Sequence, residues 1–210
     1  MRMRPLKFLL LALCGLVFST LAHAQPAQDV LAQLNARLSH YPVLRADFIQ
    51  TRQVAALKKP LISRGHLVIS RQYGVLWEIE QPLHLSYVLG DKQIVEIGAD
   101  GRSKTRDLQQ MPGMAQVARI FRALLNTQSE ALREYFDIEN TSQGERWALQ
   151  LVPRQQQLAQ YLNQVDLSGE AFVESIRVQE ASGDSTRIEF KNTKGASQLD
   201  RAEIERFGAQ

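Results

Sequence analysis

The chain has 210 residues, of which 44% are hydrophobic and 22% are charged. These fractions allow a sizeable core, and they exclude disordered, collagenous and low-complexity classes. The formal net charge is only +3, so the whole chain lacks the strong basic excess that is typical of nucleic-acid-binding proteins.

The first 24 residues form a predicted secretory signal peptide. Three basic residues precede the apolar run Phe8–Phe18, and Ala22-His23-Ala24 follows as a small-x-small cleavage pattern. The run is shorter than the roughly 20 apolar residues that a bilayer span needs. We therefore expect residues 1–24 to be removed, and residues 25–210 to form one soluble domain in the cell envelope, in the bacterial periplasm.

Removal of the signal peptide also changes the charge and chemistry of the chain. Three of the 25 basic residues lie in this peptide, so the remaining basic residues equal the 22 acidic ones in number. We therefore predict no nucleic-acid partner, because such binding depends on a basic excess or stripe. The only cysteine, Cys14, is lost too, which leaves no disulfide, no thiolate nucleophile and no cysteine ligand for a metal.

The first half of the mature chain is predicted to be one helix followed by short strands. Leu31, Leu34 and Leu38 recur at helical spacing, and Pro42 ends the helix. A two-residue period follows, interrupted by tight turns. The predicted strands are Val43–Val54, His66–Arg71, Val75–Glu80, Leu85–Leu89 and Gln93–Ile97, and a polar stretch extends from Asp100 to Gln110.

In the middle of the chain, the spacing of the apolar residues changes from the two-residue period of strands to the period of a helix. Apolar residues from Met114 to Leu125 recur at helical spacing, and the capping box of Thr127 and Glu130 begins a second, short helix. Residues 200–207 form either a helical turn or a final strand. Five later strands are predicted at Tyr135–Glu139, Trp147–Val152, Tyr161–Leu167, Phe172–Val178 and Thr186–Lys191. This order predicts a curved antiparallel sheet with helices on one side.

The residues offer little support for catalysis. His40, His66 and His84 show no metal-binding spacing, and we expect them to be surface or structural residues. Gly183-Asp184-Ser185 is interpreted as a hairpin turn rather than a nucleophile motif, and no glycine-rich phosphate-binding loop occurs. We predict no enzyme activity, no metal and no cofactor.

The more informative pattern is an apolar inner face. On each strand the more apolar side should face the interior. Arg71 shares parity with Leu67 and Ile69, so its guanidinium either faces inward, where carboxylates or carbonyls must satisfy it, or curls back to solvent. The central helical stripe is either ordinary core or the cover of a concave apolar surface suited to acyl chains. The predicted inward-facing residues are Phe48, Leu67, Ile69, Trp77 and Tyr87 from strands, and Val117, Phe121 and Leu124 from the helix.

Four blocks of residues follow one another along the chain. They are Ala46-Asp47-Phe48-Ile49-Gln50, Gly65–Arg71 with Trp77, Gln81-Pro82 with Gly90-Asp91-Lys92, and Leu151-Val152-Pro153. The first is a Phe-x-Gln strand, the second is a Gly-x-Leu block that contains an arginine and precedes a tryptophan, and the third is a hairpin that follows a proline. In this order the blocks resemble the periplasmic outer-membrane lipoprotein carrier family of the LolA type.

The resemblance implies a mainly β fold: an incomplete antiparallel barrel of about eleven strands, with an N-terminal helix and a central helical lid. It also implies a monomeric shuttle that takes acylated cargo such as lipoproteins from an inner-membrane transporter and yields it to an outer-membrane receptor. Arg71 corresponds to the arginine that bonds lid carbonyls in the closed state.

This chain resembles a divergent branch of the family. Gln72 stands where the family usually has proline, and Val95 and Ile97 replace an aromatic pair. A specialised lipid is therefore a second cargo class. Two other functions remain open: an envelope binding or sensor module that regulates a protein partner, and an enzyme acting on lipids.

Overall fold

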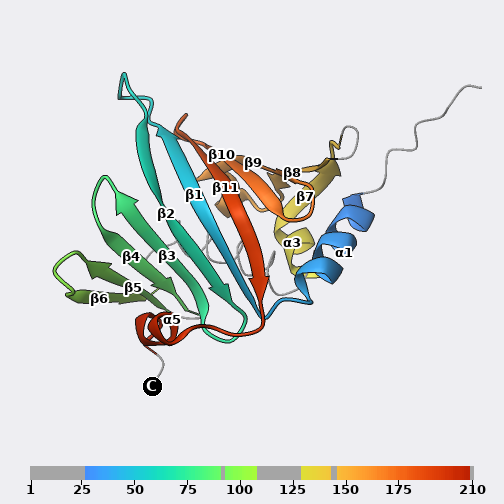
Figure 1. The fold of residues 1–210 in the computed structure, drawn as a ribbon. Coiled ribbons are helices and arrows are strands. Elements are labelled where there is room, and N and C mark those ends of the chain that lie inside the picture. Colours follow the sequence, from blue (N-terminus) through green and yellow to red (C-terminus); the bar gives the residue numbers. More distant parts are fainter. Residues whose placement is uncertain (1–26, 91–92, 108–128, 143–145, 209–210) are drawn as a thin grey trace, which may run out of the picture.

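The computed structural model describes residues 27–90, 93–107, 129–142 and 146–208 (Figure 1). In these residues the protein is an antiparallel sheet of eleven strands with short helices. The strand order is β6-β5-β4-β3-β2-β1-β11-β10-β9-β8-β7, so β6 and β7 form the edges and the sheet does not close. The predicted incomplete barrel is thus confirmed.

The first half of the sheet is a meander, as its alternating sequence predicts. Its strands are β1 (Val43–Gln53), β2 (Leu61–Ser70), β3 (Gly74–Gln81), β4 (Leu85–Leu89), β5 (Gln93–Gly98) and β6 (Ser103–Asp107). Strand β6 lies where we expected only a polar stretch. Its five residues, Ser-Lys-Thr-Arg-Asp, include no apolar side chain, so no alternation of apolar and polar residues marks them as a strand.

The second half is another meander, and β11 returns to pair with β1. The strands are β7 (Phe136–Asn140), β8 (Trp147–Pro153), β9 (Leu162–Gly169), β10 (Val173–Glu180) and β11 (Ser185–Ala196). Strand β1 therefore lies between β2 and β11 and joins the two halves into one sheet.

Four helices accompany the sheet in the described residues. They are α1 (Ala27–Leu38), α3 (Ser129–Tyr135), α4 (Gln156–Ala159) and α5 (Arg201–Arg206). The sequence did not predict α4. The undecided C-terminal segment is helical, because Asp200 and Glu203 form a capping box at its start.

The two faces of the sheet have separate cores. The inner face packs against α1 and α3: Val30 and Leu31 of α1 and Leu132 of α3 share a cluster with Phe48 and Leu67 of the sheet. The outer face carries a smaller cluster that α5 and the segment before it cover. This cluster contains Val43, Val68, Leu76 and Val88, packed against Leu199 and Phe207 among others.

Candidate functional site

The inner face of β1 to β4 holds the predicted strand residues. Leu67, Trp77 and Tyr87 are direct neighbours across β2, β3 and β4. Phe48 and Leu67 belong to the inner core cluster, and Ile69, Trp77 and Tyr87 pack against it while only partly buried. The predicted inward direction of these five side chains matches their placement, whereas their role in binding a ligand stays a prediction.

An aromatic group forms the centre of this face. The rings of Phe48 and Trp77 stack with centroids 4.0 Å apart, and Trp77 meets Phe190 of β11 edge-on at 6.5 Å. Phe48 is 2% exposed, but Trp77 is only partly buried. The buried ring of Phe48 thus supports the partly exposed ring of Trp77. The exposed part of Trp77 is an apolar surface that an apolar ligand can cover.

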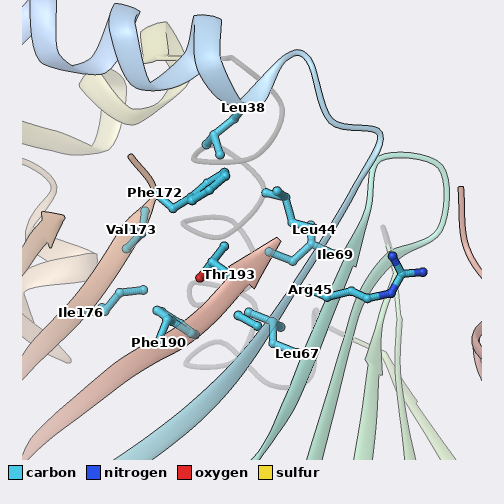
Figure 2. A pocket seen from close by; sticks show the side chains of 11 residues that line it. Leu38, Leu44, Arg45, Leu67, Ile69, Phe172, Val173, Ile176, Phe190 and Thr193 are labelled. Carbon is cyan, nitrogen blue, oxygen red and sulfur yellow. The ribbon is translucent and has the colours of Figure 1, made fainter. Parts of the chain in front are cut away.

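An apolar pocket opens beside this group, between the end of α1 and strands β1, β2, β10 and β11 (Figure 2). The volume open to the centre of a water molecule is about 50 Å³. Thr193 contributes a hydroxyl to the lining, and the guanidinium of Arg45 points away from the pocket. The other lining residues are Leu38, Leu44, Ala46, Leu67, Ile69, Phe172, Val173, Ile176 and Phe190.

A β-bulge in β11 shapes one wall of the pocket. Between the paired positions Arg45↔Lys194 and Asp47↔Lys191, β11 has one residue more than β1. Asn192 adopts a left-handed backbone with φ 54°, and its Nδ2 donates to Asp47 Oδ2 at 2.6 Å on the outer face. The bulge lets both Phe190 and Thr193 line the pocket despite their odd spacing. Sequence reasoning missed it, because an asparagine inside a polar strand end gives no unique signal.

Arg71 lies directly after β2, at the end of the inner face nearest α1. Its Nη2 donates to the carbonyl of Leu38 at 3.0 Å, and its backbone N–H donates to Pro42 at 3.1 Å. Leu38 is both the last residue of α1 and part of the pocket lining. The guanidinium thus meets a carbonyl where a helix ends over the sheet, although the residue as a whole is exposed. Its role as a lid latch stays a prediction.

Charged side chains lie at the β6 edge of the inner face, beyond Leu89 of β4 and Ile94 of β5, which still belong to the inner core cluster. Tyr87 pairs with Glu96 of β5, and Glu96 Oε2 lies 3.9 Å from Arg106 Nη2 of β6. Burial raises the pKa of the Tyr87 hydroxyl, the Glu96 carboxylate raises it further, and Arg106 opposes them. The apolar surface of the inner face therefore ends at charged side chains near the β6 edge.

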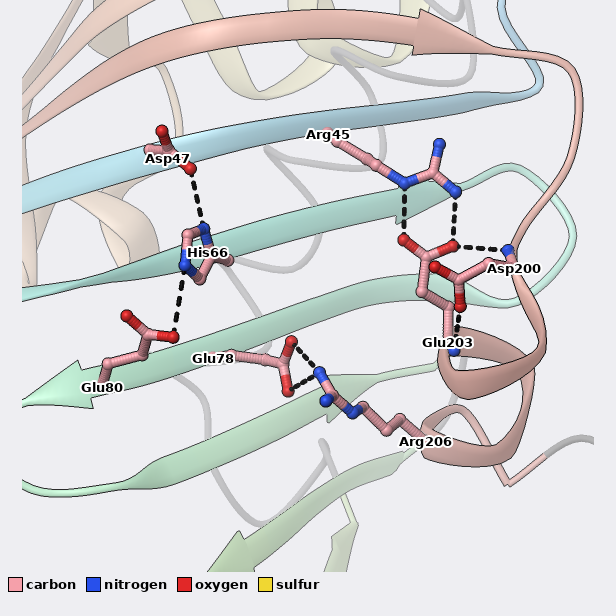
Figure 3. A network of polar contacts seen from close by, with 8 residues as sticks. All are labelled: Arg45, Asp47, His66, Glu78, Glu80, Asp200, Glu203 and Arg206. Atoms are coloured by element: carbon pink, nitrogen blue, oxygen red, sulfur yellow. Dashed lines mark hydrogen bonds and ion pairs between the residues drawn. The ribbon is translucent and has the colours of Figure 1, made fainter.

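The outer face carries a network of charges (Figure 3). Glu203 of α5 accepts from Nε and Nη2 of Arg45, each at 2.5 Å, and Arg206 reaches Glu78 at 2.6 Å. His66 Nδ1 lies 2.7 Å from Asp47 Oδ1, and Nε2 lies 3.2 Å from Glu80 Oε1. These contacts place His66 on the surface in a structural role. In the described part of the chain no group of His, Cys, Asp and Glu could hold a metal ion.

The predicted site also includes three residues from the central helix. Val117, Phe121 and Leu124 fall outside the described residues, so the central lid remains a prediction. Among the helices that the structure describes, none has the length and apolar character needed to cross a membrane.

Comparison with known proteins agrees with this open half-barrel. The family model described as "Outer membrane lipoprotein carrier protein LolA" matches residues 39–204. No curated protein sequence matches the chain.

Several solved structures are similar to this chain at low sequence identity. The MucA/MucB complex of Pseudomonas aeruginosa has a TM-score of 0.52 and 14% identity, covering 85% of this chain and 60% of that one. A LolA superfamily protein from Nitrosomonas europaea has a TM-score of 0.46 and 11% identity, covering 85% and 96%. A lipoprotein-sorting domain from Vibrio parahaemolyticus has a TM-score of 0.46 and 10% identity, covering 86% and 97%.

The fold and the site define an open half-barrel with an apolar inner face and an apolar pocket. The chain belongs to the LolA outer membrane lipoprotein carrier family, which confirms the resemblance of its sequence motifs.

Proposed function

We propose that the protein is a periplasmic carrier that binds acyl chains on the inner face of its half-barrel and shuttles the attached molecule between the two membranes of the envelope. The donor is an inner-membrane transporter and the acceptor an outer-membrane receptor. The cargo is a lipoprotein or another acylated molecule, and the carrier acts as a monomer. The family supports the class of cargo, and the predicted signal peptide supports the compartment.

The single observation that carries this proposal is the partly exposed aromatic surface beside the apolar pocket. Trp77, Ile69 and Tyr87 are packed on one side and accessible on the other. A buried methylene contributes about 0.8 kcal/mol, so even a few methylenes on this surface give useful affinity. A shallow site also allows release, because full enclosure of several long chains would hold the cargo too tightly to hand over.

The test is direct. Protein isolated from its native periplasm is extracted with organic solvent, and the extract is analysed by mass spectrometry. We expect an acylated molecule in stoichiometric amount, and we expect a fluorescent fatty acid to be displaced by it in a competition assay. Protein that carries no amphiphile and fails to bind the fluorescent probe would refute the carrier function.

Arg71 is proposed to stabilise the closed state of the carrier. The bond to the Leu38 carbonyl shows the kind of acceptor that this guanidinium finds at the end of a helix over the sheet. Each charge-assisted bond to a carbonyl contributes about 1.5 to 3 kcal/mol, so Arg71→Leu should favour the open state, retain cargo and slow its transfer to outer-membrane vesicles. Thermal melts of both proteins are the control. Transfer at the wild-type rate would exclude the latch, whatever the melting temperature.

A regulatory binding module is the second candidate. The observation in its favour is the structural similarity to the MucA/MucB complex, which shows that the same fold occurs in an assembly with another protein. A stable protein complex isolated from the native envelope, without co-purifying lipid, would favour this function over transport.

A further inference from the structure

Exposed apolar side chains gather at one end of the sheet. In the hairpin that joins β1 to β2, Leu57, Leu61 and Ile62 are 46%, 54% and 50% exposed. The other large apolar side chains that are exposed in the described residues lie toward the same end: Leu83 in the β3–β4 turn, Val152 near the end of β8 and Tyr161 just before β9. Strand register places these segments together, since Arg64 pairs with Gln81 and the carbonyl of Tyr161 accepts from Ala181 beside the β10–β11 turn.

The β1–β2 hairpin tip, residues 54–62, is the centre of this apolar end. Figure 1 shows the hairpin projecting beyond the neighbouring strands, at the end of the sheet opposite α5. Leu61 and Ile62 are consecutive strand residues, so their side chains point to opposite faces, and both are half exposed. Strand β2 contributes Leu67 to the inner cluster and Val68 to the outer one, but Leu61 and Ile62 belong to neither cluster, so packing within the described residues does not account for this pair.

The tip is also held in a defined shape. The N–H of Leu57 donates to Val54 at 2.9 Å, which closes a turn. Asp184 of the adjacent β10–β11 turn braces the hairpin, because its Oδ1 accepts from the N–H of Ala55 at 3.0 Å and its Oδ2 accepts from Arg52 at 3.3 Å. The exposed side chains are thus presented on a supported projection.

The hairpin tip also carries positive charge. Lys58 and Lys59 lie between the apolar residues, and residues 54–63 contain no acidic side chain. Apolar side chains flanked by lysines suit the interface of an anionic bilayer, where the apolar parts enter the acyl boundary and the ammonium groups meet phosphate headgroups. A bilayer interface surrounds a projection on all sides, whereas a groove on a protein contacts one face, so apolar exposure on both faces favours a membrane.

We propose that the β1–β2 hairpin tip inserts into the surface of an anionic lipid bilayer, with Leu57, Leu61 and Ile62 entering the interface and Lys58 and Lys59 contacting lipid phosphates. This membrane contact goes beyond the carrier function and does not require cargo in the inner face. It gives the protein a fixed orientation at the membrane, with α5 pointing away from it.

The first measurement uses a fluorescent label at the tip. Cys14, the only cysteine, lies in the predicted signal peptide, so a cysteine introduced into the mature protein is its single labelling site. A polarity-sensitive nitrobenzoxadiazole label on Leu57→Cys should shift to the blue and brighten with vesicles of phosphatidylcholine and phosphatidylglycerol, and respond weakly to phosphatidylcholine alone. The same label on Arg201→Cys of α5 should not respond. Equal responses at both positions, or none at position 57, would overturn the proposal.

The second measurement separates apolar from electrostatic contributions by vesicle co-sedimentation. The variant L57S/L61S/I62S should lose about tenfold or more in partition coefficient, and K58Q/K59Q should lose about tenfold. The controls L57M/L61M/I62M, which keeps the apolar surface, and K191Q/R201Q, which removes two exposed cations elsewhere, should bind like the wild type. Wild-type binding by both tip variants, or no binding of the wild type to protein-free vesicles, would overturn membrane insertion; the latter result would assign the tip to a protein partner.

The cargo assay is independent of both measurements. A tip variant that still binds the fluorescent fatty acid but not vesicles supports the membrane contact. Failure of all proteins to bind fatty acid, with vesicle binding intact, refutes the carrier function and leaves the tip proposal standing.

Discussion

The two faces of the sheet bury apolar residues in different ways. On the outer face, α5 and the segment before it close a small cluster in which Leu76 is 0% exposed, and ion pairs surround it. On the inner face, adjacent Trp77 remains partly exposed and stacks on Phe48. Leu76 and Trp77, which are consecutive in β3, thus belong to a closed core and to a partly exposed surface. We therefore expect the outer face to contribute mainly to stability and the inner face mainly to ligand binding, and substitutions can test each contribution alone.

The largest expected effect is on the outer face. Leu76→Ala removes a fully buried side chain and should lower the free energy of unfolding by about 2–5 kcal/mol, the usual range for a core leucine. Urea unfolding followed by tryptophan fluorescence measures this loss. Fatty-acid affinity at low temperature should not change, because Leu76 points away from the inner face. A large loss of affinity in the folded variant would mean that the two faces are coupled.

Trp77→Ala is the matched change on the inner face. The side chain is only partly buried, so the expected loss of stability is smaller, about 1–3 kcal/mol. Affinity for the fluorescent fatty acid should fall by about tenfold or more, since the variant removes a large, partly exposed aromatic ring from the inner face. Unchanged affinity would show that the fatty acid binds elsewhere, and it would contradict the proposed role of the aromatic group.

Glu203→Gln tests how α5 is held on the outer face. The Glu203 side chain accepts from Arg45 and from the N–H of Asp200, and the residue is 7% exposed. Loss of the charge leaves the partly buried Arg45 without its counter-ion, so we expect a loss of about 1–3 kcal/mol and faster proteolysis within α5. Glu205→Gln is the control, because Glu205 pairs with exposed Arg201 and its change should have little effect.

Much of the fold could be predicted because its information is local. The alternation in Val75–Glu80 defines β3 and the opposite directions of Leu76 and Trp77, and the turns after it define the meander. Strand β6 was missed because Ser103–Asp107 has no apolar side chain to alternate, so only pairing with β5 reveals it. Residues 108–128 contain the predicted lid helix, which remains a prediction.

The details of the site could not be predicted because they depend on contacts between distant segments. Arg45 and Glu203 are separated by 158 positions, and the bulge at Asn192 is supported by Asp47 on another strand. Arg71 had two interpretations, inward or toward solvent. The structure combines them, because the residue is exposed while one guanidinium nitrogen still reaches the carbonyl of Leu38.

The smallest expected effect concerns Asp47 and the acid stability of the outer face. The side-chain hydrogen bond from Asn192 lowers the pKa of the Asp47 carboxyl, and His66 and Lys194 lower it further against an opposing contribution from burial. A carboxyl whose pKa is lower in the folded state stabilises the fold above its unfolded pKa of about 3.9, and this contribution is lost as the pH falls through the folded pKa. Asp47 is 44% exposed, so the contribution is small. Urea midpoints measured from neutral to acid pH should therefore fall less steeply for Asp47→Asn than for the wild type. Asn192→Gly removes the donor but suits the left-handed backbone, so it should flatten the acid limb in the same direction. Identical pH profiles for all three proteins would show that this bond does not stabilise the ionised carboxylate.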